Sequence, residues 1–368
     1  MSIHEILIAV MAVFALLGGV DRIWGNRFGL GKEFEEGILA MGSLTLAMVG
    51  IVSLAPVLAG LLRPVVLPVY GLLGADPAMF AGTILACDMG GGSLALQMTE
   101  DPQAAMLGGV LTGSMLGATL VFTIPVALGI LREDDRPALA KGVLCGIITV
   151  PLGVLVGGLV SGFPLGMVLR NLVPIVVMAA LIALGLWRAE KAMVRGFALF
   201  GKGVVAVSTL GLAAAIVHAL TGFTLIPGIA PITQGFETVG AIAIVLAGAF
   251  PLVHMLTKLL RKPLMGVGRL LGINDAAAAG LIASLANSIA TFGLVKDMNP
   301  RGKVVNIAFA VSAAFVFGDH LGYTAGFAPQ MLPGMILGKL SESSPAASPA
   351  QSRRYSPNDP QKQMLQTR

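Results

Sequence analysis

Long apolar stretches recur along the whole chain and restrict its fold more than any other feature. Hydrophobic residues make up 56% of the sequence and charged residues only 12%. A helix of about 20 apolar residues is long enough to cross the hydrocarbon core of a bilayer. We therefore predict an all-α polytopic membrane protein, built as a helical bundle. By length and apolarity the expected segments are 3–20, 37–62, 78–98, 104–131, 138–162, 165–187, 197–221, 235–260, 276–298 and 302–330.

The charges and the cysteines argue against several other classes of protein. The net charge of +5 is carried by basic residues in short loops between apolar segments, a topology signal rather than a nucleic-acid-binding surface. Cys87 and Cys145 both fall in apolar segments, so we expect no disulfide framework. The first apolar segment lacks a basic leader and a cleavage site, which predicts a retained helix. The sequence predicts no cofactor and no metal site.

The chain matches itself when it is shifted by 198 residues. We predict from this an internal duplication within a transmembrane domain at 1–340, with repeat one at about 3–187 and repeat two at about 197–340. Residues 341–368 are rich in Ser, Pro, Gln and Arg and are predicted to form a disordered tail, so repeat two lacks a last apolar helix. The matches include Gly37, Gly42 and Gly50 with Gly235, Gly240 and Gly248, Leu72–Gly74 with Leu270–Gly272, Pro102 with Pro300, and Ser114 with Ser312.

The distribution of basic residues predicts how the two repeats enter the membrane. If 78–98 and 276–298 are re-entrant hairpins, nearly all basic residues before the tail lie on one side of the bilayer. Only Arg63, Arg170 and Lys339 then lie on the other side. The positive-inside rule makes the first side cytoplasmic, and the repeats acquire inverted topology. Two further segments, 64–75 and 263–275, are predicted to be short interfacial helices.

Asp88 is the first candidate for a functional residue. It lies in Cys87–Gly92, where three consecutive glycines interrupt an apolar stretch. An ionisable group at membrane depth is costly, and irregular backbone persists there only where it lines protein or a wet cavity. Asp88 is therefore predicted to pair with a cationic headgroup near the membrane midplane. The alternative is a structural role, in which its carboxylate accepts backbone N–H groups at the hairpin tip.

Polar residues at two other interruptions complete the predicted site. Asn287 and Ser288 lie at the tip of the second hairpin, where they could bind a substrate hydroxyl or only satisfy freed carbonyl groups. Asp319 and His320 lie in a second glycine-bounded interruption, Gly318 to Gly322. They are interpreted as a second substrate contact, as a proton site that uses histidine chemistry, or as an internal polar pair that joins helices.

Several strings of residues resemble the ethanolamine permease family of bacterial ethanolamine-utilisation operons. The resemblance runs from about residue 3 to about residue 340. It implies a bacterial inner-membrane protein that admits ethanolamine for catabolism in the cytoplasm, and it implies no particular ligand residues. The strings are Phe34–Gly37, Leu46–Gly50, Phe80–Thr83, Cys87–Gly91, Ser114–Met115, Ile124–Gly129, Lys262–Met265 and Gly318–Gly322.

Together these observations predict a permease that carries protonated ethanolamine across the bilayer by alternating access at a midplane site. The alternatives are a transporter of another small organic solute, a cation channel, or a membrane enzyme. An enzyme is disfavoured because the acidic pair Asp134–Asp135 lies in a loop between arginines, and no His-x-x-x-His, Gly-x-Ser-x-Gly or phosphate-loop motif occurs. The sequence leaves both facilitated diffusion and proton coupling open.

Overall fold

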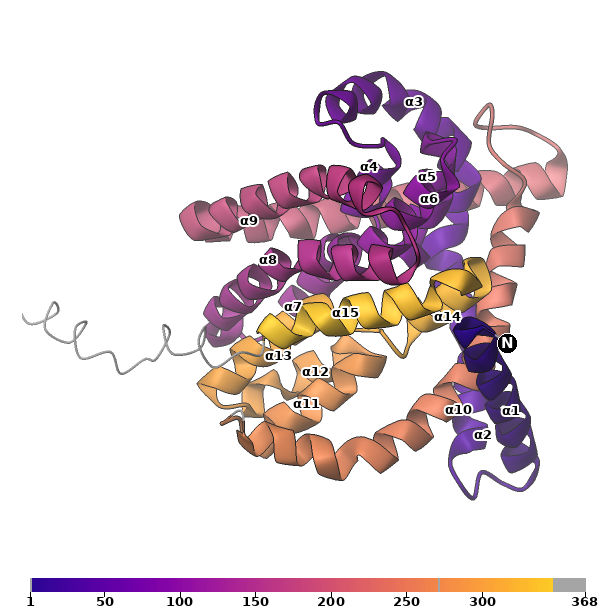
Figure 1. The fold of residues 1–368 in the computed structure, drawn as a ribbon. Coiled ribbons are helices and arrows are strands. Elements are labelled where there is room, and N and C mark those ends of the chain that lie inside the picture. The colour runs from indigo at the N-terminus through magenta and orange to yellow at the C-terminus, as the bar shows by residue number, and fades with distance from the viewer. Residues whose placement is uncertain (1, 271, 347–368) are drawn as a thin grey trace, which may run out of the picture.

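The computed structural model describes residues 2–270 and 272–346, with the side chains of 260–265, 267–270 and 342–346 outside the description. Every regular element in these ranges is a helix, which confirms the prediction of an all-α protein (Figure 1). Six stretches are long and apolar enough to cross a membrane, as expected for a polytopic protein. They are Ile3–Ile23, Leu30–Leu72, Pro102–Ile130, Glu133–Val160, Leu165–Thr221 and Ile232–Leu259.

The longest helix, α9 (Leu165–Thr221), accounts for two of the predicted segments. Its 57 residues would extend about 85 Å at the rise of an α-helix, more than twice the thickness of a bilayer core. The backbone leaves helical geometry at Ala189, where φ is −143° and ψ is 46°. This kink lies between the predicted segments 165–187 and 197–221, so the two were correctly separated.

The helical stretch predicted to form the first hairpin is interrupted at its tip in the structure. Helix α4 (Ala78–Ile84) ends in extended backbone, a short 3-10 turn η2 (Cys87–Met89) follows, and α5 (Gly91–Met98) begins after Gly90. The Thr99 hydroxyl donates a hydrogen bond to the Asp76 carboxylate at 2.9 Å. A continuous helix would separate these two residues by about 34 Å. The chain therefore reverses between them.

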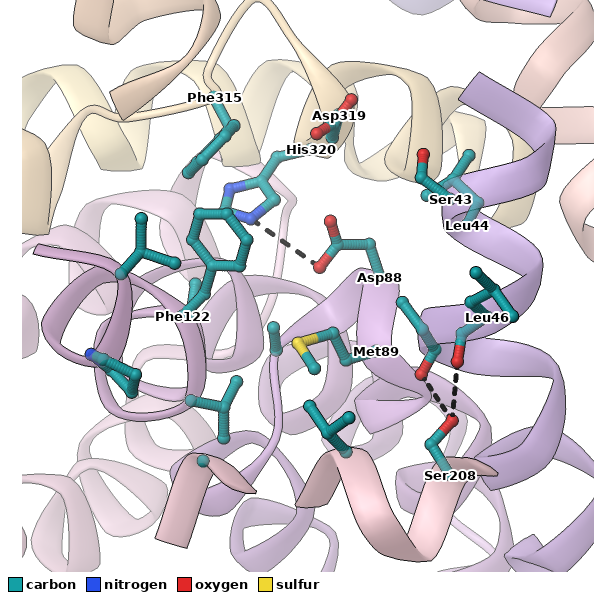
Figure 2. A pocket seen from close by; sticks show the side chains of 18 of the residues that line it. Ser43, Leu44, Leu46, Asp88, Met89, Phe122, Ser208, Phe315, Asp319 and His320 are labelled. Atoms are coloured by element: carbon teal, nitrogen blue, oxygen red, sulfur yellow. Dashed lines mark hydrogen bonds and ion pairs between the residues drawn. The ribbon is translucent and has the colours of Figure 1, made fainter. Parts of the chain in front are cut away.

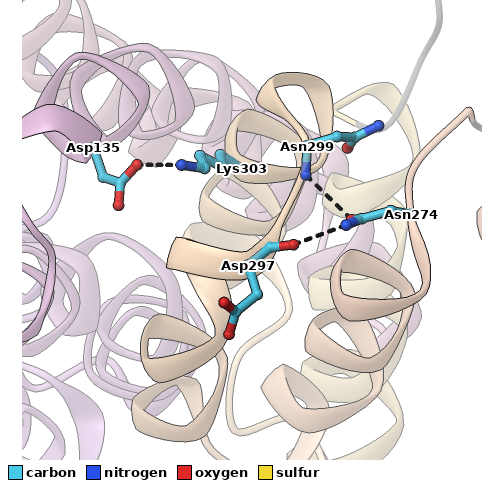
Figure 3. Close-up of polar contacts among 5 residues, drawn as sticks. All are labelled: Asp135, Asn274, Asp297, Asn299 and Lys303. Atoms are coloured by element: carbon cyan, nitrogen blue, oxygen red, sulfur yellow. Dashed lines mark hydrogen bonds and ion pairs between the residues drawn. The ribbon is translucent and has the colours of Figure 1, made fainter.

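The second predicted hairpin is broken as well. Helix α11 (Asp275–Ala286) ends at Asn287, which is extended, and α12 (Ser288–Leu294) begins at the next residue and leads into a 3-10 turn, η6 (Val295–Asp297). The Thr291 hydroxyl donates to the Gly280 carbonyl at 2.8 Å, a contact that a straight helix would forbid. At the base of the hairpin, the Asn274 amide donates to the Asp297 carbonyl at 2.8 Å (Figure 3).

Residues related by the 198-residue shift perform equivalent tasks at the two hairpin bases. Asp76 and Thr99 close the first base, and Asn274 and Asp297, which are 198 positions further on, close the second. The residues that follow cap the next helices in the same way. They are Asp101, which accepts from the Gln103 backbone N–H at 2.9 Å, and Asn299, which accepts from the Gly302 N–H at 2.8 Å.

Two close helix contacts between the repeats are reciprocal. A side chain at Gly37 would collide with the backbone of Ala247, and a side chain at Gly235 would collide with Val49. Gly235 lies 198 residues after Gly37, and Ala247 lies 198 residues after Val49. Reciprocal contacts of this kind arise when two similar units are related by a twofold axis. The orientation of the two units relative to the membrane stays a prediction.

The helices next to the hairpins complete the bundle. Figure 1 shows α4 and α5 in the upper half of the molecule and α11 and α12 in the lower half, with α8 (Arg136–Val160) and α15 (Leu332–Ala346) between them. Lys303 forms an ion pair with Asp135 and so joins repeat two to the turn before α8 (Figure 3). The other elements are α1 (Ile3–Ile23), α2 (Leu30–Leu44), η1 (Thr45–Val49), α3 (Gly50–Leu72), α6 (Pro102–Met106), η3 (Leu107–Gly117), η4 (Thr119–Thr123), α7 (Ile124–Ile130), η5 (Glu133–Asp135), α10 (Ile232–Leu270), α13 (Pro300–Ser312), α14 (Asp319–Phe327) and η7 (Pro329–Met331).

Several predicted boundaries are wrong. The segments 64–75 and 263–275 are not separate helices, because α3 continues through Pro64 and Pro68 to Leu72 and α10 continues to Leu270. Helix α15 extends to Ala346, past the predicted start of the polar tail at 341, and supplies the first part of the helix that repeat two was expected to lack. The rest of the predicted tail, 347–368, lies outside the described residues.

The position of Lys339 also differs from the prediction, which placed this residue outside the bundle. It is only 1% exposed, and its ammonium group donates to the carbonyl oxygen of Ser114 at 2.5 Å. Ser114 belongs to η3, a stretch wound as a π-helix. The contact ties α15 of repeat two to the centre of repeat one. A buried cation therefore lies inside the bundle, where the sequence pattern placed a loop.

Candidate functional site

A cavity of about 690 Å³ lies where the first hairpin tip meets elements of both repeats (Figure 2). One water molecule occupies about 30 Å³ in the liquid, so the cavity can hold a small solute together with many waters. Its walls are mainly apolar, with acidic, basic and hydroxyl groups at a few points. The lining residues are Ser43, Leu44, Leu46, Ala47, Ala86, Asp88, Met89, Ala118, Val121, Phe122, Pro125, Val126, Ala198, Gly201, Lys202, Val205, Ser208, Phe315, Asp319 and His320.

Asp88 projects from the broken tip of the first hairpin into this cavity. The break requires Gly90, whose φ of +90° lies in the left-handed region that favours glycine and which packs directly against Ile51. The Asp88 side chain is 16% exposed, and Figure 2 shows its carboxylate directed toward the His320 ring. The sequence prediction that a carboxylate at this interruption faces a cavity agrees with this geometry.

Asp319 and His320 reach the same cavity from the opposite wall. The irregular stretch that precedes them ends at Gly318, and α14 begins at Asp319. The interruption therefore lies before this pair rather than around it, which corrects its predicted position at Gly318–Gly322. Nε2 of His320 lies 3.9 Å from a carboxylate oxygen of Asp88, too far for a hydrogen bond. The structure thus brings Asp88, Asp319 and His320 together.

Two phenylalanines that the sequence analysis did not select lie beside His320. Phe315 contacts Phe122 edge-to-face with ring centroids 5.4 Å apart, and its centroid is 5.2 Å from that of His320. Phe315 has a φ of +63°, a strained conformation for a bulky residue. Its backbone N–H donates to the Ser284 carbonyl at 3.0 Å, which helps to hold that conformation. No local sequence signal marks such a contact, because it depends on the second hairpin.

Asn287 and Ser288 lie outside the residues that line the cavity. The Asn287 side chain accepts a hydrogen bond from the Ile289 backbone N–H at 2.8 Å and so caps α12. Ser288 is fully buried, and its hydroxyl has no hydrogen-bond partner within the described part of the chain. The structure therefore does not bring these two candidates together with the other three. Their role as ligands stays a prediction.

Positive charge approaches the cavity as well as negative charge. Lys202, an exposed residue in the second half of α9, is part of the lining. The buried Lys339 lies deeper in the bundle, where its ammonium group donates to the Ser114 carbonyl. The described lining of the cavity therefore combines two carboxylates, Asp88 and Asp319, with one lysine.

A smaller cavity of about 170 Å³ lies along the second arm of the first hairpin. Uncharged polar side chains from α5 and α10 line it, together with apolar residues of α3. The lining residues are Val52, Ala55, Pro56, Ser93, Leu96, Gln97, Gln234 and Thr238. The first hairpin therefore has solvent-sized space at its tip and also along its second arm.

Broken helices around a cavity with two carboxylates, within a bundle of helices long enough to cross a membrane, define a polytopic membrane protein with a solute-sized internal cavity. The family model described as "Ethanolamine utilisation protein, EutH" matches residues 3–348. The chain belongs to the EutH family, and it is a multi-pass bacterial membrane protein.

Several bacterial relatives match nearly the full length of the chain. It is 61% identical over 340 residues to the probable ethanolamine permease EutH of Listeria monocytogenes, covering 92% of this chain and 91% of the relative. It is 48% identical to the probable ethanolamine permease EutH of Salmonella typhimurium, covering 92% and 93% of the two chains. The uncharacterized protein YxeR of Bacillus subtilis is 50% identical, with 95% of each chain covered. No solved structure matches this chain.

Proposed function

We propose that this protein is an inner-membrane permease that imports ethanolamine, and that it binds the protonated solute in the cavity at Asp88. The names of its relatives in Listeria and Salmonella support the solute. The observation that carries the site is a carboxylate on a broken helix that faces a cavity within the bundle. Intramembrane carboxylates with this surrounding are typical of substrate pathways.

The proposed pose uses the chemistry of the two ends of ethanolamine. The ammonium group, with three donors, pairs with the Asp88 carboxylate, and the aromatic rings of Phe122 and Phe315 supply polarisable faces nearby. The hydroxyl group reaches the Asp319 carboxylate on the opposite wall. His320 lies beside Asp88 in the cavity wall and limits where the solute can lie. We leave Asn287 and Ser288 out of this pose, because they do not line the cavity.

We infer further that transport proceeds by alternating access between two inverted repeats in 1–340. The reciprocal contacts of Gly37 and Gly235 support a twofold relation between the repeats. The cavity wall is shared, with Asp88 from repeat one and Asp319 from repeat two. Movement of one repeat against the other would therefore change the distance between the two carboxylates and the access to the solute.

Uptake of labelled ethanolamine into proteoliposomes tests the proposal, with and without an imposed proton gradient. We expect saturable uptake that unlabelled ethanolamine competes away. Stimulation by the gradient would show proton coupling, and indifference to it would show facilitated diffusion. Ion flux that does not saturate with solute would support a channel. Saturable uptake of another small solute, with no competition by ethanolamine, would contradict the proposed substrate. Consumption of ethanolamine without uptake would indicate an enzyme.

A further inference from the structure

We propose that Cys87, Asp88 and His320 form a binding site for a divalent transition-metal ion such as Zn²⁺, and that the bound ion blocks the solute site. The three residues come from the first hairpin tip and from the start of α14. The sequence predicted no metal site, because the histidine lies far along the chain from the other two ligands. Folding alone brings them together.

The geometry of the three side chains fits one metal ion. One ligand atom of each residue, the cysteine sulfur, a carboxylate oxygen and an imidazole nitrogen, lies within 4.8 Å of the other two. Tetrahedral zinc with its usual bond lengths holds its ligand atoms about 3.3–3.8 Å apart. Small changes of side-chain torsion therefore bring the three atoms to coordination distance, and the fourth position faces the cavity.

The state of His320 is the second observation that points to a ligand. The residue is 2% exposed, and its Nδ1 has no hydrogen-bond partner in the described residues. Its Nε2 lies 3.9 Å from a carboxylate oxygen of Asp88, which is too far for a hydrogen bond. A buried imidazole normally uses both nitrogens. The ring is positioned instead by packing against Phe315, which leaves Nε2 directed at Asp88 without a bond (Figure 2).

The donor atoms determine the class of metal. A set of sulfur, nitrogen and oxygen suits Zn²⁺ and its neighbours in the transition series, whereas Mg²⁺ and Ca²⁺ prefer oxygen alone. On binding, the Cys87 thiol loses its proton to solvent and coordinates as the thiolate. Structural zinc sites use four protein ligands, whereas this site offers three. We therefore expect a reversible inhibitory site rather than a permanent structural one.

Occupancy of this site and binding of the solute exclude each other. Both the metal and the ammonium group need the Asp88 carboxylate, which is the most exposed of the three ligands and lines the cavity. The metal consequently enters from the cavity and occupies the position of the ammonium group. Zinc should act as a competitive inhibitor of uptake. The competition between zinc and ethanolamine rests on the proposed function, whereas the metal site itself does not.

Cobalt binding to the purified protein tests the metal site independently of transport. Co²⁺ bound to a thiolate gives a sulfur-to-metal charge-transfer band in the near ultraviolet. The chain has two cysteines, so Cys145→Ala leaves Cys87 as the only thiol and serves as the matched control. We expect one equivalent of Co²⁺ to produce the band in the wild type and in Cys145→Ala, and Zn²⁺ to remove it.

Cys87→Ser should lose that band while eluting as the wild type does in size-exclusion chromatography. A band that persists in Cys87→Ser, or that is absent from Cys145→Ala, overturns the metal site. The second result needs no variant at Cys87 and stands even if substitutions there prevent folding.

Inhibition of uptake tests whether the metal and the solute compete. Zn²⁺ should raise the KM for ethanolamine without lowering the maximal rate. Cys87→Ser should require at least about tenfold more Zn²⁺ for the same inhibition, because the loss of one ligand weakens zinc binding by about 1.4 kcal/mol or more. Cys145→Ala should behave as the wild type does. Equal inhibition of both variants would overturn the proposal. Absence of ethanolamine uptake from every form would instead refute the proposed function, with the cobalt result still informative.

Discussion

The two hairpins share an architecture and differ at their tips. Both are closed at the base by residues at the same 198-residue spacing, Asp76 with Thr99 and Asn274 with Asp297. The first tip carries a carboxylate, Asp88, into the cavity. The second tip lies outside the cavity lining. The two hairpins are therefore similar supports, of which one presents a charge to the proposed solute path.

The second hairpin uses its polar groups internally. The Thr291 hydroxyl lies 2.8 Å from both the Ser284 hydroxyl and the Gly280 carbonyl, and Asn287 caps the following helix. Partners of this kind lower the cost of burying a polar group at membrane depth, although the Ser288 hydroxyl has none among the described residues. The difference between the two tips indicates that an interruption in a membrane helix can have either of two roles. It can hold a solute, or it can stabilise the protein that surrounds the solute.

The largest effect is expected from neutralising the first tip. Asp88→Asn removes the charge that pairs with the ammonium group, and the loss of a charge-assisted hydrogen bond, about 1.5–3 kcal/mol, lowers uptake by roughly 10- to 100-fold. Uptake of labelled ethanolamine per amount of membrane-inserted protein measures it. Asn287→Ala, at the second tip, is the control and should retain uptake within about threefold, because it costs only a helix cap worth about 1 kcal/mol. Equal losses in both variants would remove the distinction between the tips.

Substitutions that affect stability should instead cost more at the second hairpin than at the first. Thr291→Val leaves the Ser284 hydroxyl and the Gly280 carbonyl without their partner, which costs about 1–3 kcal/mol of unfolding free energy. Thermal unfolding of the detergent-solubilised protein measures this change. The matched variant is Ser93→Ala, 198 residues earlier on the first hairpin, where the side chain lines the smaller cavity. It should change stability by less than about 0.5 kcal/mol. A larger loss at Ser93 than at Thr291 would contradict the assignment of the structural role.

The smallest effects concern the backbone of the tips. Gly90→Ala places a side chain at a φ of +90° and against Ile51, and a left-handed residue with a side chain costs about 1–2 kcal/mol. Gly293, inside α12, has open space around it, so Gly293→Ala should stabilise the protein by about 0.5–1 kcal/mol. Melting temperatures of the two variants should therefore shift in opposite directions. A melting temperature of Gly90→Ala at or above that of the wild type would show that the first tip does not need its glycine.

The breaks in the two hairpins could be predicted because their signals are local. Glycines next to Asp88, and an Asn–Ser pair within an apolar stretch, mark interruptions whatever the rest of the fold does. The same reasoning correctly separated the two halves of α9. The 198-residue spacing could also be read from the sequence, and the contacts at the two hairpin bases follow it; the duplication itself stays a prediction.

Other features depend on contacts between distant segments and could not be read in this way. The interruption before Asp319 is held by hydrogen bonds from the Phe315 and Phe317 backbone to carbonyls of Ser284 and Leu285. The burial of Lys339 depends on the Ser114 carbonyl in the other repeat. For the same reason the sequence alone indicated neither the contact between Phe122 and Phe315 nor the proximity of Cys87 to His320.

The most direct test of the account is equilibrium binding of labelled ethanolamine to the purified protein in lipid nanodiscs. Binding avoids the question of coupling and reports on the cavity alone. We predict saturable binding in the wild type, retained in Asn287→Ala, weakened in Asp88→Glu and lost in Asp88→Asn. Undiminished binding in Asp88→Asn, or equal loss in Asn287→Ala, would contradict the claim that the charged tip of the first hairpin receives the ammonium group.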